Sequence, residues 1–337
     1  MSNSRAVLRK KRKKRILRLS LLFVFLSLFA AGILFAIDIF YSGYKATDSI
    51  YQKLGPEKNQ RAEEVEVTKD PFTILLVGLE NQEGGKGRSD VIMMISVNPQ
   101  TEEITMLSIP RDTRTFIPDA GYEDKITHSY GHNGITSTID TVEEMIDVPV
   151  DYFITTNFEG FEDIVDTLGG VTVDVPFDFQ AQLTGSLKWK KYYEGEMDLN
   201  GNEALAYVRM RKSDPRGDLG RNERQQQVIK EIIDEGTSFS SITKIDDILN
   251  DLGENVKTNI PPSKFASFVK LYSKLKNTQI NQLSLKGYDD YIDDVYYYIP
   301  DQDSLNEITL SINQTLDGES SYNSSEDTGL NTANNDN

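Results

Sequence analysis

One short stretch of the chain holds a dense group of cations. Between residues 209 and 224 there are six basic residues, and five of the six are arginine. The planar guanidinium group of arginine can donate two parallel hydrogen bonds to a phosphate, which the ammonium group of lysine cannot do. The stretch therefore predicts a binding site for a di-anion or a larger anion. Its cations are Arg209, Arg211, Lys212, Arg216, Arg221 and Arg224.

The spacing of these side chains indicates two groups. Arg209 and Arg211 are two residues apart, so an extended backbone would direct both to the same side. Arg221, Arg224 and Gln225 are three and four residues apart, so a helix would present them on one face. We interpret the stretch as two groups of donors that can close around one anion.

A helix is expected to begin inside the stretch, since either Asp218 or Asn222 can cap it. Helix N-termini attract anions through their free N–H groups and the macrodipole. The alternative is a solvated basic loop, which is what most charge runs are. Against it, apolar residues continue the helix at a spacing that places Arg221 and Gln225 on the buried face. These apolar residues are Val228, Ile229, Ile232 and Ile233.

The charge of the rest of the chain makes such a cluster informative. The 337 residues include 36 basic and 53 acidic ones, for a net charge of −17. Nine of the cations fall in the first 18 residues, and without them the net charge is −26. Binding along a nucleic acid needs a broad basic face, so we expect no nucleic-acid partner. The absence of cysteine and the presence of only two histidines exclude disulfides, a thiol nucleophile and a histidine-rich metal site.

A second group of candidate residues surrounds a glycine-rich loop. Glu80 precedes the loop and Asp90 follows it, with Arg88 close to Asp90. Two carboxylates without histidine or cysteine suit Mg²⁺ or Mn²⁺, which prefer oxygen ligands and retain water or substrate phosphates. Glu80 and Asp90 are therefore candidate ligands of a metal site. A solvent-facing polar loop with an aspartate that caps the next strand fits the same residues.

A third candidate is Arg111, in the segment 108–113. Pro110 ends a predicted strand, so Arg111 lies just past the edge of a sheet, where ligand-binding loops are built. A structural turn in which Arg111 pairs with Asp112 would have the same sequence. The local residues do not separate the two interpretations.

The N-terminal segment indicates a membrane protein. Residues 19–37 are nineteen residues without a charge, enough to cross a bilayer as a helix. The basic residues before them predict a cytoplasmic N-terminus and an extracellular remainder, the single-pass type II arrangement. A cleaved signal peptide is the alternative, but no small-residue cleavage site follows. We expect a cytoplasmic basic segment over 1–18, a transmembrane signal anchor over 19–40 and a juxtamembrane spacer over 41–70.

The elements that must position the candidate residues alternate between strands and helices. Strands are expected at 72–77, 91–97, 104–109, 151–156, 171–175, 279–285 and 295–299, with the second and third joined as a hairpin. Helices are expected at 158–168, 199–208, 225–235, 263–275 and 304–313. This alternation predicts a single α/β domain over 71–313, a layered sandwich with a central mixed β-sheet flanked by helices. Residues 314–337 are too polar to bury themselves, and we predict disorder there.

Taken in order, these segments resemble the LytR–CpsA–Psr family of cell-envelope glycopolymer transferases. The resemblance covers residues 71–227, and beyond Glu235 it is too weak for residue assignments. It is carried by residues 72–78, 87–90, 107–113, 125–128, 157–176 and 204–227, of which the last segment is the most specific. The short cytoplasmic segment and the single anchor are also similar to the family.

The resemblance implies an enzyme that transfers an anionic glycopolymer, such as wall teichoic acid, from an undecaprenyl-pyrophosphate carrier to a sugar hydroxyl of peptidoglycan. A phosphodiester would form and undecaprenyl phosphate would leave. The matched positions imply pyrophosphate binding by Arg88, Arg111, Arg209, Arg211, Arg221 and Gln225. Catalysis is expected to depend on Asp90, Arg111, Arg209, Arg211 and Asp218.

One position departs from the family pattern. The family usually has Gly-x-Asp where this chain has Gly78-Leu79-Glu80, whereas Asp90 matches a metal-associated aspartate. Glu80 keeps the charge but reaches one methylene further, which puts the geometry and occupancy of a Mg²⁺ site in question.

The remaining chemistry leaves three candidates for the proton acceptor. Phosphoryl transfer depends mostly on positioning and charge stabilisation. Asp218 or Asp90 could accept the proton of the attacking hydroxyl, and His128 is a third candidate, although a lone histidine is more often structural. The lipid tail needs an apolar trough, for which ordinary core residues are the alternative interpretation. The candidates are Phe158, Phe161, Val165 and residues 228–232.

Two other functions fit the same residues. With water as the acceptor, the protein would be a polyprenyl-pyrophosphate phosphohydrolase. Without catalysis, it would be an envelope scaffold or attenuator that binds an anionic glycan or lipid. All three functions place the domain on the outer side of a Gram-positive cell membrane.

Overall fold

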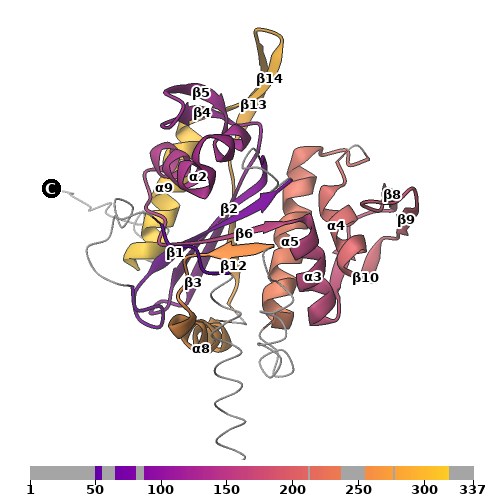
Figure 1. Ribbon diagram of the computed structural model, residues 1–337, viewed down its shortest axis with the longest axis horizontal. Coiled ribbons are helices and arrows are strands. Elements are labelled where there is room, and N and C mark those ends of the chain that lie inside the picture. The colour runs from indigo at the N-terminus through magenta and orange to yellow at the C-terminus, as the bar shows by residue number, and fades with distance from the viewer. Residues whose placement is uncertain are drawn as a thin grey trace, which may run out of the picture.

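A mixed six-stranded sheet forms the centre of the computed structural model, which describes residues 50–54, 65–80, 87–211, 213–236, 255–275 and 278–318. The strand order is β11-β6-β1-β2-β3-β12 (Figure 1). β2 runs antiparallel to β1 and β3, whereas β6 is parallel to β1 and β12 is parallel to β3. The strands are β1 (Phe72–Leu79), β2 (Ser89–Asn98), β3 (Glu103–Ile109), β6 (Tyr152–Asn157), β11 (Val256–Thr258) and β12 (Ile280–Ser284).

Helices cover this sheet, and a smaller group of helices and hairpins lies beside it (Figure 1). α2 and α9 pack against one face, and α8 contributes to the core on the other. The helices are α2 (Tyr130–Ile146), α3 (Phe158–Leu168), α4 (Gly201–Arg209), α5 (Asp218–Gly236), α8 (Phe265–Leu275) and α9 (Gln302–Asp317), with short 3-10 turns η2 (Ile126–His128) and η3 (Pro262–Lys264). The predicted sandwich of a mixed sheet and flanking helices is therefore present.

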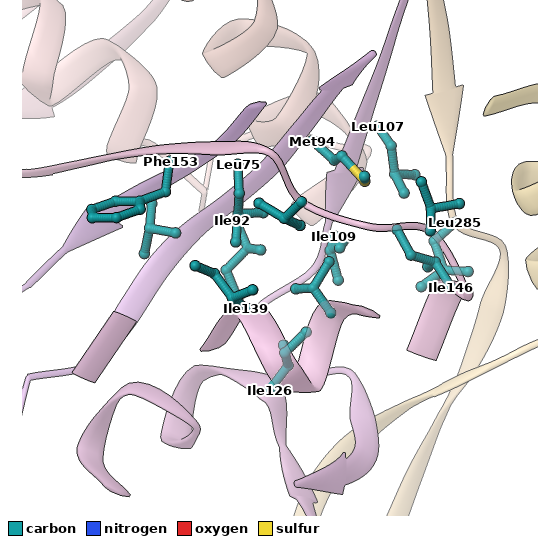
Figure 2. Close-up of a cluster of buried hydrophobic side chains, with 14 of the residues drawn as sticks. Leu75, Ile92, Met94, Leu107, Ile109, Ile126, Ile139, Ile146, Phe153 and Leu285 are labelled. Carbon is teal, nitrogen blue, oxygen red and sulfur yellow. The ribbon is translucent and has the colours of Figure 1, made fainter. Parts of the chain in front are cut away.

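Alternate residues of β1 face the two layers, as the period of a strand requires. Leu75 and Val77 are buried in the core formed with α2 and α9, whereas Phe72 and Ile74 contribute to the core on the opposite face. Figure 2 shows the first of these cores, to which Leu75 of β1 and Ile139 of α2 both contribute. Because both faces of the sheet are covered, β1 is almost continuously apolar in sequence.

The second, smaller group has its own apolar core, formed by α3, α4, α5 and short strands. Within the described residues, eight short strands form four two-stranded sheets. They are β4 (Arg114–Ile117) with β5 (Tyr122–Lys125), β7 (Val171–Val175) with β10 (Gly195–Leu199), β8 (Phe179–Gln182) with β9 (Trp189–Tyr192), and β13 (Gly287–Ile292) with β14 (Val295–Pro300).

Each predicted strand and helix has a counterpart in the structure, with shifted ends. The helix predicted at 199–208 begins at Gly201 because Asn200 caps it and Leu199 ends β10. The sequence did not reveal α2, whose buried face is rich in serine and threonine and whose path is interrupted at Asn133 and Gly134. It also did not reveal the hairpins β4–β5 and β8–β9, or the strands β10 and β13.

The predicted ends of the domain need correction. We predicted disorder from residue 314, but α9 continues to Asp317. Thr315 is buried there, where its hydroxyl lies 2.7 Å from that of Thr105 and its carbonyl accepts from Asn98. These hydrogen bonds satisfy the polar groups of Thr315, which is why a polar residue can be buried at the end of α9. Before the domain, Ile50 and Val67 of the predicted spacer are buried as well.

The predicted cytoplasmic segment at 1–18 and the anchor at 19–40 lie outside the described residues, as does the tail after residue 318. Within the described part of the chain, no helix has the length and apolar character to span a bilayer.

Candidate active site

Three strand ends meet at one edge of the central sheet. Because β2 is antiparallel to both neighbours, it begins at the edge where β1 and β3 end. Glu80 directly follows β1, Asp90 lies at the start of β2 and Arg111 follows β3. Ile92 of β2 pairs with Ile109 of β3. Two residues nearer to this edge, before Ile92 and after Ile109, the same register places Asp90 across from Arg111. The topology therefore brings together two of the candidate groups that the sequence suggested separately.

Arg111 is held by carboxylates at this edge. Its Nη1 lies 2.8 Å from Asp90 Oδ1, and its Nε lies 3.6 Å from Asp112 Oδ2. Burial lowers the pKa of Arg111, but the hydrogen bond and charge of Asp90, together with the charges of Asp112 and Glu80, raise it more. The net pKa is raised, so the guanidinium group stays charged. The charge of Glu80, which directly follows β1 at this edge, therefore also acts on Arg111.

Asp112 connects Arg111 to the arginine-rich stretch. Its Oδ1 accepts a hydrogen bond from Lys125 Nζ at 2.8 Å. Burial would raise the pKa of Asp112, but Lys125, and then the charges of Arg111 and Arg211, lower it. Arg211 therefore lies near the same carboxylate as Arg111, from which it is separated by one hundred residues in the chain. The pairing of Arg111 with Asp90 also shows that Arg111 is not engaged by Asp112 alone.

Arg209 lies at the same edge, one strand away. Its guanidinium carbon is 4.2 Å from the centroid of the Phe158 ring, and its Nη1 donates to Thr184 Oγ1 at 3.2 Å. Phe158 follows β6 directly, and the last residue of β6, Asn157, pairs with Leu79 of β1. Arg209 is thus positioned close to the end of β1, which precedes Glu80.

Helix α5 carries Arg221 and Gln225 on its inner side. Both side chains are buried, as the helical spacing predicted, and Gln225 Nε2 lies 3.5 Å from the carbonyl oxygen of Val208. The next residue, Gln226, donates to Ser108 Oγ at 3.0 Å and so attaches α5 to the end of β3. A solvated loop does not describe this part of the stretch.

Arg224 has a structural role. Its side chain is 2% exposed, forms an ion pair with Asp214 and donates to the carbonyl oxygens of Tyr207 and Met210. Gly220 packs so closely on Asp214 that a Cβ atom there would overlap the carboxylate. Arg224 therefore holds the loop before α5 in place, and its donors are occupied by the protein.

For the remaining candidates, the structure describes fewer contacts. Arg216 is 41% exposed on its side chain and pairs with Glu223. Asp218, one of the two predicted starting points, is the first residue of α5, but its side chain and the whole of Lys212 lie outside the described residues. Arg88 has an exposed side chain, and its carbonyl accepts from the amide of Glu80 at 3.0 Å, so it lies at the same edge.

His128 is paired with a carboxylate that the sequence analysis did not single out. Its Nδ1 lies 2.8 Å from Asp124 Oδ2, and the hydroxyl of Tyr297 lies 3.3 Å from the other oxygen of Asp124. The amide of Thr127 donates to the carbonyl of Arg111 at 3.1 Å, which fixes this segment beside the strand end. The spacing of four residues between Asp124 and His128 was a readable signal, whereas Tyr297 could not be foreseen.

The geometry agrees with a comparison of the sequence with known families. The chain matches the LytR_cpsA_psr family over residues 37–314. The chain belongs to this family. Among its relatives, TagU of Bacillus subtilis strain 168 is named a polyisoprenyl-teichoic acid–peptidoglycan teichoic acid transferase. It is 42% identical over 312 residues, which cover 92% of this chain and 98% of TagU.

Solved structures of LytR_cpsA_psr relatives share the architecture. The crystal structure of TagV from B. subtilis has a TM-score of 0.66 and 40% identity, covering 74% of this chain and 98% of that one. The structure described as TagT bound to LI-WTA has a TM-score of 0.63 and 33% identity, covering 78% of this chain and 97% of that one. The mixed sheet flanked by helices is thus the common frame of the family.

The predicted metal ligands fit a magnesium ion in their chemistry. Glu80 and Asp90 both lie beside Arg111, and one oxygen of Asp90 is engaged by that arginine. The described residues contain no group of three or more histidines and carboxylates that could hold a metal ion. Mg²⁺ is commonly bound by one or two carboxylates together with substrate phosphates and water. Glu80 and Asp90 would therefore need substrate phosphates and water to complete the ligands of Mg²⁺ in this LytR_cpsA_psr member.

Proposed function

We propose that this protein moves an anionic glycopolymer from an undecaprenyl-pyrophosphate carrier to a sugar hydroxyl of peptidoglycan. The observation that carries the proposal is Arg111 at the end of the central sheet, held by Asp90 at 2.8 Å and 31% exposed, with the charge of Arg211 acting on the neighbouring Asp112. Two guanidinium groups held in this way suit a pyrophosphate. The names of the relatives place the chain among transferases and support teichoic acid as the polymer.

In the proposed binding step, Arg111, Arg209 and Arg211 neutralise the pyrophosphate. Each charge-assisted hydrogen bond contributes about 1.5–3 kcal/mol. Asp90 fixes the direction of Arg111, while Lys125 offsets the charge of Asp112. The arginines are thereby oriented before the substrate arrives, which lowers the entropy cost of binding it.

In the transfer step, the oxygen of the acceptor hydroxyl attacks the phosphorus atom that carries the glycan. The bond from that phosphorus to the bridging oxygen breaks, and undecaprenyl phosphate leaves with the bonding electrons. The arginines stabilise the charge on the phosphoryl oxygens, which is the main demand of such reactions. The product is a phosphodiester between the glycan and peptidoglycan.

The proton of the hydroxyl passes to a base, for which Asp90, Asp218 and His128 are candidates. One oxygen of Asp90 is engaged by Arg111. His128 is already oriented by Asp124, an arrangement that leaves its Nε2 as the proton-accepting atom when Nδ1 carries the hydrogen. We therefore place His128 ahead of Asp90.

Glu80 and Asp90 would hold Mg²⁺ in this proposal, with Mn²⁺ as a substitute. The ion would supply positive charge to the phosphate oxygens. Glu80 would have to adjust for its additional methylene. It can do so by changing rotamer, because its side chain is exposed.

Transfer can be tested with the full-length protein in detergent and a synthetic polyprenyl-pyrophosphate oligosaccharide, with and without peptidoglycan oligomers. We expect a phosphodiester-linked product only when peptidoglycan is present. Free oligosaccharide phosphate at equal rates in both reactions would instead identify a phosphohydrolase. Binding without any product would support the scaffold. Arg111→Ala serves as the inactive control, and Arg114→Ala as the matched variant, because Arg114 pairs with Glu123 on the neighbouring hairpin.

We further propose a single-pass type II arrangement, with residues 19–40 as the anchor and the domain outside the cell. The support is the charge-free run at 19–37 behind a basic segment. Protease added to wall-stripped cells should digest the domain. Survival of the domain until the membrane is permeabilised would reverse the orientation.

A further inference from the structure

The hairpin β8–β9 carries the most exposed large apolar side chain of the described residues. Leu187 in its turn is 90% exposed, and Trp189 and Tyr193 are 63% and 57% exposed. Gln182 pairs with Trp189 in the register, so the outer face of the hairpin carries Trp189 together with Lys191. In Figure 1 the hairpin projects at the right side of the molecule, away from the central sheet.

The inner face of the same hairpin is firmly packed. Phe179 stacks on Tyr192 with the ring centroids 4.6 Å apart, and Tyr192 donates to the carbonyl of Glu203 at 2.7 Å. Lys190 points inward to the Glu203 carboxylate at 2.6 Å. The exposed apolar residues of the outer face therefore lie on a hairpin whose other face is well packed.

The charge of the hairpin is opposite to that of the protein. From residue 179 to residue 193 there are three lysines and no acidic residue, in a chain of net charge −17. The acidic residues that flank this segment, Asp178 and Glu194, lie at the open end of the hairpin, where they are joined by a hydrogen bond of 2.8 Å. Lys188 is exposed in the turn between Leu187 and Trp189, and Lys191, which pairs with Gln180, is exposed on the same outer face as Trp189.

We propose that the tip of this hairpin, residues 187–189, rests in the interface of an anionic lipid bilayer, with Lys191 and Tyr193 exposed on the outer face behind it. Tryptophan and tyrosine favour the headgroup layer, leucine favours the acyl boundary, and lysines bind anionic lipids. A soluble polyanion would engage the lysines but would leave Leu187 and Trp189 in water. The combination of an apolar tip and flanking cations therefore favours a lipid surface over a polymer.

The hairpin is also connected to the candidate active site. Thr184, which precedes the tip, accepts a hydrogen bond from Arg209 at 3.2 Å through its hydroxyl. Its carbonyl accepts from Asn202 of α4 at 3.2 Å. Contact with the bilayer would thus bring the end of α4 close to the headgroup layer. This inference rests on the hairpin itself and stands whether or not the proposed transfer is correct.

The chain contains a single tryptophan, so its fluorescence reports on this hairpin alone. The full-length protein would be placed in nanodiscs of phosphatidylglycerol and phosphatidylcholine, with ordinary or brominated acyl chains. We expect brominated lipid to quench Trp189 by at least half and the bilayer to shield it from acrylamide. Equal emission in both lipids, with full access to acrylamide, would overturn the proposal.

A matched control moves the reporter to the other projecting hairpin. The double variant Trp189→Phe with Tyr291→Trp places the only tryptophan on β13, at a position that is 70% exposed. It should show no quenching by brominated lipid. Equal quenching at both positions would mean that tethering alone brings any surface to the bilayer, and would also overturn the proposal.

Charge reversal tests the contribution of the lysines. Lys188→Glu with Lys191→Glu should return the quenching to the level of the control, since each basic residue near an anionic surface changes binding about fivefold. Soluble poly(glycerol phosphate) tests whether the hairpin binds an anionic polymer and not the lipid surface. If the polymer changes Trp189 emission while brominated lipid does not, the hairpin binds the polymer and the lipid proposal is wrong.

Discussion

Two arginine–aspartate pairs in this molecule differ in their surroundings. Arg224 and Asp214 are 2% and 0% exposed on their side chains, and further donors of Arg224 bond to backbone carbonyls. Arg111 and Asp90 are 31% and 17% exposed, at the end of the sheet where Arg211 also approaches. The first pair closes a loop, whereas the second, in our proposal, presents a cation to the pyrophosphate.

The difference shows that a dense run of arginines can contain two kinds of residue. Arg209, Arg211 and Arg224 lie within sixteen positions of one another, yet Arg224 is enclosed by the protein. A fully buried arginine must have its donors satisfied internally, because leaving a buried charge unpaired is costly. Each of the following changes tests this division between structural and ligand-binding pairs.

The largest expected effect is on stability, at the buried pair. Arg224→Ala leaves the buried carboxylate of Asp214 without its partner, and we expect a loss of about 3–5 kcal/mol in the free energy of unfolding. Denaturant unfolding followed by circular dichroism measures it. Lys69→Ala, which breaks a pair with Glu66 that is exposed on both sides, should cost less than about 1 kcal/mol. Similar costs for the two variants would remove the distinction.

Arg111 should show the opposite behaviour, with a large effect on activity and a small one on folding. Arg111→Ala is expected to lower transfer about a hundredfold, which corresponds to about 3 kcal/mol of transition-state stabilisation. Arg111→Lys should recover little, since lysine lacks the bidentate geometry. A steady-state assay and a thermal melt of the same samples measure both quantities. A stable Arg111→Ala variant with wild-type activity would refute the anion-binding interpretation.

The carboxylates beside Arg111 should differ from one another by about tenfold. Asp90→Ala removes both the partner of Arg111 and a proposed metal ligand, so we expect Mg²⁺-dependent transfer to fall by about that factor. Glu80→Asp should keep or increase it, because aspartate restores the family pattern. Titration of activity with Mg²⁺ measures the effect. Equal, small changes for both variants would mean that no metal depends on this pair.

The smallest effect concerns acid stability at Asp112. Its folded pKa lies below the unfolded value of about 3.9, so its ionised form stabilises the fold fully above that pH. The contribution is lost as the pH falls through the folded pKa. In Lys125→Met, burial is opposed only by Arg111 and Arg211, so the folded pKa should move up toward the unfolded one. The acid-dependent loss of stability should then be smaller and end at a higher pH. Unfolding experiments between about pH 2 and pH 6 would show the change, and Asp112→Asn should abolish the contribution.

Much of the fold followed from local patterns in the sequence. The apolar runs of β1, β2 and β3 are readable because both faces of the sheet are covered. α2 was missed since its buried side chains include Ser137, Thr138 and Thr141, which do not form an apolar stripe. The hydroxyl of Thr141 bonds to the carbonyl of Ser137, so its burial depends on a contact within the helix that composition does not show.

The sequence predicted which residues form the candidate site, but only part of the contacts between them. Arg111 and Asp90 were chosen for their positions at strand ends, and the antiparallel register then made them partners. The role of Asp112 in joining Arg111 to Arg211 depends on a contact across one hundred residues, which no local pattern contains. Likewise, nothing in the spacing of the cations distinguishes Arg224 from Arg221.

Asp90 and Arg111 face each other across the β2–β3 ladder, and this pairing limits where residues can be inserted or deleted. Deletion of one residue within β2 or β3 would shift the ladder, move Asp90 off Arg111 and turn the following side chains to the other layer. Insertions between Glu80 and Gly87 leave that ladder intact, because they fall outside both strands. Natural variation in length should therefore gather between Glu80 and Gly87 and in the turn at 99–102, while the paired lengths of β2 and β3 stay fixed.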